Sequence, residues 1–261
     1  MTRPRLVLAL LALGIALAAP AQAAPPRYYL ALGDSDAFGF QFPKYAPGVA
    51  AATFATGYAD VIAARLRRIV VNYGCPGEST LTFGTGPCPY KAAGQQLHDD
   101  YPGSQLAAAV EFLLTHRGRT DLVTLTLWGN DINALLARCH GEFTCVQVHA
   151  PAEIAEFSHR LTAILVALRL AAGPRTPIVL TGPYDPNLQP LAEQTHPLFR
   201  ALDDAMKLAA ERVGARYVAL LETLGSDAAL CTLTLQCTNG DAHPSDTGYI
   251  TIADRIIEAL G

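Results

Sequence analysis

Apolar residues along the chain follow two alternating patterns. Short runs of apolar and β-branched residues, typical of buried strands, occupy residues 27–32, 70–74, 121–129, 176–182 and 215–220. Longer segments with apolar residues at helical spacing occupy residues 57–69, 104–117, 131–139, 151–172, 196–212 and 246–260. The pattern therefore predicts strands that alternate with helices, and the chain shows no internal repeats.

Such alternation favours an α/β fold whose strands run parallel in a sheet that helices cover on both faces. Ligands of these sheets bind beyond the carboxyl ends of the strands. Segments of small and polar residues follow the first three predicted strands, at residues 33–36, 72–80 and 129–131. We expect these segments to meet at one edge of the sheet.

The amino terminus has the composition of a secretory signal peptide. The basic MTRPR is followed by the apolar run LVLALLALGIALAA and by Ala21-Gln22-Ala23, a cleavage site of small residues. A membrane anchor is the alternative, but the apolar run is shorter than the roughly 20 residues of a spanning helix. We therefore expect cleavage after Ala23, a secreted protein, and a single domain over residues 24–261.

Composition and charge narrow the class of protein. Hydrophobic residues make up 51% of the chain and charged residues 16%, which is enough apolar material for a sizeable core. The net charge is −4 and the basic residues are scattered, so the chain lacks the basic surface of a nucleic-acid-binding protein. We expect a monomer whose partner is a small molecule.

The six cysteines lie in three close pairs. An even number of cysteines in an exported chain favours disulfides. Local pairing is the simplest prediction, and it joins Cys75 to Cys88, Cys139 to Cys145 and Cys231 to Cys237. Zinc is the alternative, because His140 and His149 lie near the second pair, but the chain has no CxxC spacing.

Candidate catalytic residues lie in the segments that follow the predicted strands. Ser35, in the stretch LGDSDA, comes directly after the first strand, and a serine nucleophile needs a base and an oxyanion site. Among the seven histidines, His243 lies between the last strand and the terminal helix, from where it can reach the same edge. Gly77 and Asn130 could donate hydrogen bonds to an oxyanion. Each of these residue types is also common in simple turns and helix caps.

Taken together, the four segments resemble a known family. GDS near the amino terminus, the glycine-bearing NYGCPGEST, then GND and a carboxy-terminal HP are similar to the GDSL esterases and lipases, also called SGNH hydrolases. The cysteine pairs resemble those of the secreted bacterial branch. The α/β-hydrolase elbow is a poorer match, because it needs several strands before the serine.

The resemblance implies a three-layer α/β/α sandwich with a five-stranded parallel sheet, which is a flavodoxin-like SGNH hydrolase fold. It implies that Ser35 is the nucleophile and His243 the general base. The oxyanion donors would be the N–H groups of Ser35 and Gly77 and the side chain of Asn130. No cofactor or metal is implied.

Two positions depart from the family pattern. The residue after the serine is usually leucine, and here it is Asp36. The usual last block, Asp-x-x-His, would place the acid at position 240, which is Gly240. We predict that Asp241 orients His243 instead. The alternative is a Ser–His dyad whose imidazole is oriented by a backbone carbonyl.

These residues predict a secreted serine esterase or lipase that hydrolyses carboxylic esters through an acyl-enzyme. A catalytically inactive binding module on the same scaffold is the alternative, which the displaced acid suggests. The family covers lipids, phospholipids, thioesters and acetylated glycans, and the fold does not choose among them. Candidates for an acyl pocket are the aromatic residues Tyr45, Phe54, Phe83, Tyr90 and Tyr184.

Overall fold

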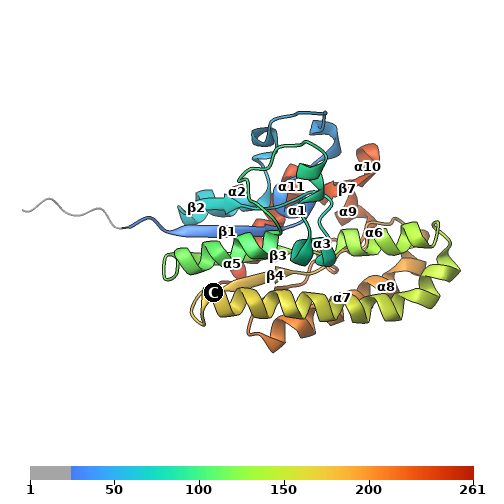
Figure 1. Cartoon of the computed structure of the whole chain (residues 1–261). Coiled ribbons are helices and arrows are strands. Elements are labelled where there is room, and N and C mark those ends of the chain that lie inside the picture. The colour runs from blue at the N-terminus through green and yellow to red at the C-terminus, as the bar shows by residue number, and fades with distance from the viewer. Residues whose placement is uncertain (1–24) are drawn as a thin grey trace, which may run out of the picture.

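Five parallel strands form the central sheet, in the order β2-β1-β3-β4-β5 (Figure 1). This computed structural model describes residues 25–261, so the expected signal peptide, residues 1–23, lies outside the described residues. The strands are β1 (Tyr28–Gly33), β2 (Ile69–Asn72), β3 (Thr120–Thr126), β4 (Ile178–Thr181) and β5 (Arg216–Val218). The predicted α/β sandwich with its five-stranded parallel sheet is thus confirmed.

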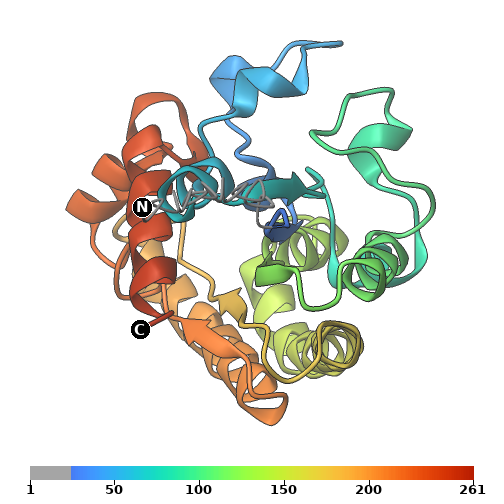
Figure 2. The same ribbon diagram turned by 90° about the vertical axis from the view of Figure 1, so that its left-hand side faces the viewer.

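Helices cover both faces of this sheet. The α-helices are α1 (Ser35–Phe38), α2 (Tyr58–Leu66), α3 (Thr80–Thr85), α4 (Pro89–Ala92), α5 (Gln105–Thr115), α6 (Gly129–Arg138), α7 (Phe143–Ala172), α8 (Leu191–Arg212), α9 (Asp227–Leu233), α10 (Gln236–Asn239) and α11 (Asp246–Glu258). Two short 3-10 helices are η1 (Phe42–Lys44) and η2 (Ala51–Phe54). Helices α2 and α11 pack together on one face, and α5, α7 and α8 pack side by side on the other (Figure 2).

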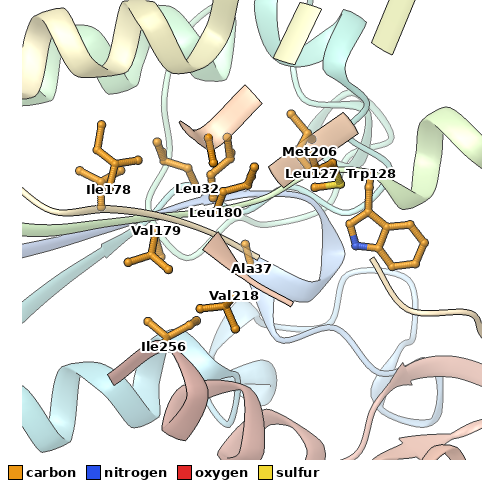
Figure 3. Close-up of a cluster of buried hydrophobic side chains, with 14 of the residues drawn as sticks. Leu32, Ala37, Leu127, Trp128, Ile178, Val179, Leu180, Met206, Val218 and Ile256 are labelled. Carbon is orange, nitrogen blue, oxygen red and sulfur yellow. The ribbon is translucent and has the colours of Figure 1, made fainter. Parts of the chain in front are cut away.

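The core lies on both sides of the sheet because side chains alternate along each strand. On β4, Leu180 points to the face where Met206 of α8 packs, and Val179 points to the opposite face, toward Ile256 of α11 (Figure 3). All four residues are fully buried. Strands of a parallel sheet that is covered on both faces are mostly apolar along their length, and all four residues of β4, IVLT, are buried.

Two helices begin earlier than the sequence pattern predicts. Helix α7 begins at Phe143 instead of residue 151, and α8 begins at Leu191 instead of residue 196, so each contains a proline near its start. A proline removes one backbone hydrogen bond from a helix. In α7 the extra turns bury Val146 and Ala150 against Leu135 of α6, which compensates for that loss.

The three predicted disulfides are present. They join Cys75 to Cys88, Cys139 to Cys145 and Cys231 to Cys237, with Cα–Cα distances of 5.9, 5.5 and 5.0 Å. The first joins the loop after β2 to α4, the second joins the end of α6 to α7, and the third joins α9 to α10. Zinc binding by the second pair is excluded because both thiols are bonded to each other.

A small ribbon lies beside the main sheet. It consists of the antiparallel strands β6 (Thr234–Leu235) and β7 (Asp241–Pro244). In Figure 1, β7 lies near α1, at the end of the sheet toward which β1 runs. Among residues 25–261, no helix combines the length and the apolar character that a membrane span requires.

Candidate active site

Ser35 is the first residue of α1, directly beyond the end of β1. The chain reaches it through Gly33, whose φ is +129° and whose added Cβ would lie 1.8 Å from the carbonyl oxygen of Thr126, so a side chain there would clash. Asp34 is the N-cap, and its Oδ1 accepts a hydrogen bond from the N–H of Asp36 at 3.1 Å. A tight, capped turn therefore fixes Ser35 at the carboxyl edge of the sheet.

His243 lies within hydrogen-bond distance of this serine. Its Nε2 is 2.9 Å from Ser35 Oγ, and its Nδ1 is 2.5 Å from Asp241 Oδ1. The Asp241 side chain is only 2% exposed, and its Oδ2 accepts a hydrogen bond from the Phe42 N–H at 2.8 Å. The structure thus brings serine, histidine and acid into one hydrogen-bonded chain, with a carboxylate at Nδ1 instead of a backbone carbonyl.

The two-residue spacing of Asp241 and His243 follows from the conformation of β7. In an extended strand residues i and i+2 lie on the same face, so an acid two positions before the histidine can reach its ring. The backbone N–H of His243 also donates a hydrogen bond to Asp241 Oδ1 at 3.1 Å, so both the backbone and the ring of His243 contact this carboxylate. An extended segment therefore makes Asp241 the neighbour of the imidazole although position 240 is glycine.

The hydrogen-bond partners of Asp241 stabilise its ionised form. Burial alone would raise the pKa of this carboxyl group, but the hydrogen bond and charge of His243, together with the N–H groups of Phe42 and His243, outweigh it. The net result is a pKa below the ordinary value of an aspartate. Asp241 therefore carries a negative charge next to the imidazole at neutral pH.

The predicted oxyanion donors lie at the same site. Ser35, Gly77, Asn130 and His243 all line one cavity. Asn130 is in the first turn of α6, and its Nδ2 donates one hydrogen bond to the carbonyl oxygen of Glu78 at 2.9 Å. Gly77 has a φ of +87°, which favours glycine at that position. The structure thus brings together the five residues predicted to be catalytic, which are Ser35, Gly77, Asn130, Asp241 and His243.

Asp36 is a second carboxylate at this cavity. Asp36 is 5% exposed and lines the cavity. Burial raises the pKa of Asp36 to about 6, although the charge of His243 acts in the opposite direction. The position that is usually leucine in the family therefore adds an acidic group close to Ser35.

The cavity has a volume of about 710 Å³ and mainly apolar walls. Of the aromatic residues expected in an acyl pocket, Tyr45, Tyr90 and Tyr184 line it. The expectation was wrong for Phe54 and Phe83, which are fully buried in hydrophobic clusters and do not reach the cavity. Aromatic residues pack in cores as readily as in pockets, and only the fold separates the two uses.

Sequence reasoning missed most of the cavity wall. Phe40 and Phe42 pack against the His243 ring, with centroid distances of 5.1 and 5.6 Å. Helices α6, α7 and α8 form another part of the wall, through Ile132, Leu136, Phe143, Val146, Leu198 and Phe199. The spacing of Ile132 and Leu136 on one face of α6 was the available signal, but it is equally typical of core packing.

Metal binding finds no support in the composition of the site. Residues 25–261 contain no group of three or more histidine, cysteine or carboxylate side chains placed to hold a metal ion. The polar side chains among the described residues that line the cavity are suited to hydrogen-bonding and acid–base chemistry, and a serine there contacts a histidine. This arrangement can perform nucleophilic chemistry on an electrophilic carbon.

Comparison with known proteins places the chain in a family. Residues 31–249 match the model of the GDSL-like lipase/acylhydrolase family. Similar solved structures include phospholipase A1 from Streptomyces albidoflavus, with a TM-score of 0.61 and 16% identity over 90% of this chain and 100% of that one. A lipase from a goat rumen metagenome has a TM-score of 0.60 and 18% identity over 89% and 97% of the two chains.

A variant of an acetyl xylan esterase from Geobacillus stearothermophilus has a TM-score of 0.53 and 17% identity over 90% of this chain and 94% of that one. At these identities the similarity shows the shared fold alone. No curated protein is similar to this chain in sequence. Since the family model covers most of the chain, the protein belongs to the GDSL-like lipase/acylhydrolase family, the SGNH hydrolases.

Proposed function

We propose that this protein is a carboxylic ester hydrolase that forms a covalent acyl-enzyme on Ser35. The observation that carries the proposal is the hydrogen-bonded chain from Ser35 through His243 to the buried Asp241, at 2.9 and 2.5 Å. A serine hydroxyl becomes an effective nucleophile when a neutral imidazole takes its proton and a carboxylate orients that imidazole.

Each residue has one role in the reaction. Ser35 Oγ attacks the ester carbonyl carbon while its proton moves to His243 Nε2, and the carbonyl oxygen becomes an oxyanion. Asp241 holds the proton on Nδ1 and stabilises the imidazolium. When the bond to the alcohol breaks, His243 returns its proton to the leaving oxygen. Water then attacks the acyl-enzyme with His243 as base, which releases the acid and restores Ser35.

Three hydrogen-bond donors face the developing oxyanion in this proposal. The backbone N–H groups of Ser35 and Gly77 donate to no acceptor within residues 25–261. Asn130 Nδ2 uses one hydrogen on Glu78 and keeps the second. Donors that are already in place stabilise charge without reorganisation, which is the usual source of rate enhancement in acyl transfer.

The two sides of the cavity suit different parts of the substrate. The leaving oxygen must reach His243 Nε2, so the alcohol lies on the side of Phe40 and Phe42, which pack against that ring. The acyl chain then extends along the part of the wall that α6, α7 and α8 form. The residues of that part are mainly apolar.

The preferred substrate class is an uncharged ester with an apolar acyl chain. A cavity of about 710 Å³ leaves most of its apolar surface uncovered by an acetyl group. The residues that line it include Asp34 and Asp36 but, within the described chain, no lysine or arginine. An anionic head group would therefore find no cation there. The lipases among the structural neighbours fit this class better than the acetyl xylan esterase.

We propose export as the location. The signal-peptide composition of residues 1–23 and three disulfides are both typical of proteins in oxidising compartments.

A fluorophosphonate probe and a series of p-nitrophenyl esters test the proposal. The wild type should be labelled, whereas Ser35→Ala should show neither labelling nor turnover. Ser158→Ala, on α7 away from the cavity, serves as the matched control and should behave as the wild type. Each added methylene should raise kcat/KM about fourfold, from roughly 0.8 kcal/mol per buried CH₂, until the wall is covered. An unlabelled wild type would instead favour a binding module.

A further inference from the structure

Two polar side chains next to the site are completely buried and take no part in the reaction described above. Gln105, at the start of α5, and Glu78 are both 0% exposed. Gln105 Oε1 accepts a hydrogen bond from the Gly33 N–H at 2.6 Å, and its Nε2 donates to the Gly33 carbonyl oxygen at 3.0 Å. The same Nε2 donates to Glu78 Oε2 at 3.1 Å. One amide therefore joins the end of β1 to the loop after β2.

Each end of this pair is attached to a segment that carries an oxyanion donor. Gly33 lies two residues before Ser35, and Glu78 directly follows Gly77. The carbonyl oxygen of Glu78 accepts the hydrogen bond from Asn130 Nδ2 at 2.9 Å. The three donors come from the turn between β1 and α1, from the loop after β2 and from α6. Gln105 with Glu78 connects all of these segments.

A buried polar pair destabilises the fold relative to apolar side chains of the same size. Glu78 Oε1 is buried and has no hydrogen-bond partner among the described residues. Burial raises the pKa of Glu78 to about 7. Buried polar groups that lack a partner destabilise a fold, and well-packed apolar residues of the same volume are often equally or more stable. Packing alone therefore does not account for a carboxyl group at this position, whereas its contacts with the donor segments do.

We propose that Gln105 and Glu78 are positioning residues that hold the oxyanion donors at the spacing the transition state requires. The inference rests on the proposed function. Donors act fully only within a small distance of the oxyanion, and a displacement of about 1 Å can cost about 100-fold in rate. Substrate binding depends much less on this spacing because the oxyanion exists only after attack.

The test removes the pair without changing its volume much. Glu78→Met and Gln105→Met should each lower kcat at least about 10-fold, with KM within about threefold of the wild type. A trifluoromethyl ketone, which adds to Ser35 and places an oxyanion in the same site, should lose affinity in parallel with kcat/KM. Glu78→Gln keeps an oxygen that can accept from Gln105 Nε2, and it should recover at least about a third of kcat.

A control variant separates positioning from general destabilisation. Thr124 on β3 is also 0% exposed, and its Oγ1 is 2.8 Å from the hydroxyl of Tyr29. Thr124→Val should lower the free energy of unfolding but leave kcat and the affinity for the ketone unchanged. Urea unfolding of every variant shows that each is folded under assay conditions.

The outcomes that overturn the two proposals differ. Folded methionine variants with the kcat and ketone affinity of Thr124→Val would overturn the positioning role and leave the esterase mechanism intact. A wild type without Ser35-dependent turnover would overturn the proposed function and this inference with it. If a methionine variant does not fold, Gln105→Asn, whose side chain is one methylene shorter, is tested in its place. A wild-type kcat of Gln105→Asn would also contradict the proposal.

Discussion

Replacing Glu78 by glutamine should make the stability of the protein less dependent on pH. The ordinary pKa of a glutamate is 4.5, and burial raises the pKa of Glu78 to about 7 in the folded protein. Between these values the folded state holds a proton that the unfolded state has lost. Stability therefore falls as pH rises through this range, and the full loss is reached above about pH 7. The glutamine side chain does not ionise in this pH range, so it contributes no such dependence.

The magnitude follows from the two pKa values. At 1.36 kcal/mol per pKa unit, ionisation of Glu78 destabilises the wild type by about 3 kcal/mol at pH 8 and by about 1 kcal/mol at pH 5. Glu78→Gln should thus raise the free energy of unfolding relative to the wild type, and this increase should be about 2.5 kcal/mol larger at pH 8 than at pH 5. For a chain of this size that corresponds to a relative Tm increase of about 5–10 °C.

Urea unfolding followed by circular dichroism, with the disulfides intact, measures this difference at both pH values. All other titrating groups are common to both proteins, so their contributions cancel in the comparison. Glu222→Gln, an exposed glutamate on the loop after β5, is the matched control and should change stability by less than about 0.5 kcal/mol at either pH. An equal effect of Glu78→Gln at pH 5 and pH 8 would show that Glu78 does not titrate as a buried group.

Three further substitutions test the site. Asp241→Asn should lower kcat by about 10³–10⁴-fold, because the amide no longer holds the correct imidazole tautomer; a change below threefold in steady-state assays would exclude Asp241 as the orienting acid. Asn130→Ala should lower kcat by about 10²–10³-fold with little change in KM, and an unchanged kcat would remove Asn130 from the oxyanion donors. Leu198→Trp should lower kcat/KM for octanoate esters more than 10-fold and for acetate esters less than threefold, since the bulkier ring fills the acyl wall; equal losses for both esters would place the acyl chain elsewhere.

The order of elements was predictable because it depends on local patterns. Continuous apolar runs and helical spacing are properties of neighbouring residues, and they identified the five strands of the sheet and the main helices around it. Helix starts were less predictable, since the early turns of α7 are stabilised by contacts with α6 that lie outside the local sequence. The short helices α3, α4, α9 and α10 have too few turns to show a period.

The candidate residues were partly predictable for a related reason. Ser35 was identifiable because a parallel sheet gathers the segments that follow its strands at one edge. Asp241 was uncertain from sequence, since only the extended conformation of β7 places it at the imidazole. Glu78 and Gln105 gave no signal, because a glutamate in a loop and a glutamine at a helix start are ordinary at the surface.

By itself, then, the sequence determined the alternation of strands and helices, the local cysteine pairs and the segments in which the reactive groups lie. The tertiary structure alone decided that Ser35 and His243, 208 residues apart, lie 2.9 Å from each other. It also decided which apolar residues form the cavity and which polar ones are buried behind it. The physical reason is that periodicity is a property of adjacent residues, whereas distance, burial and the resulting pKa values arise only when distant segments pack together.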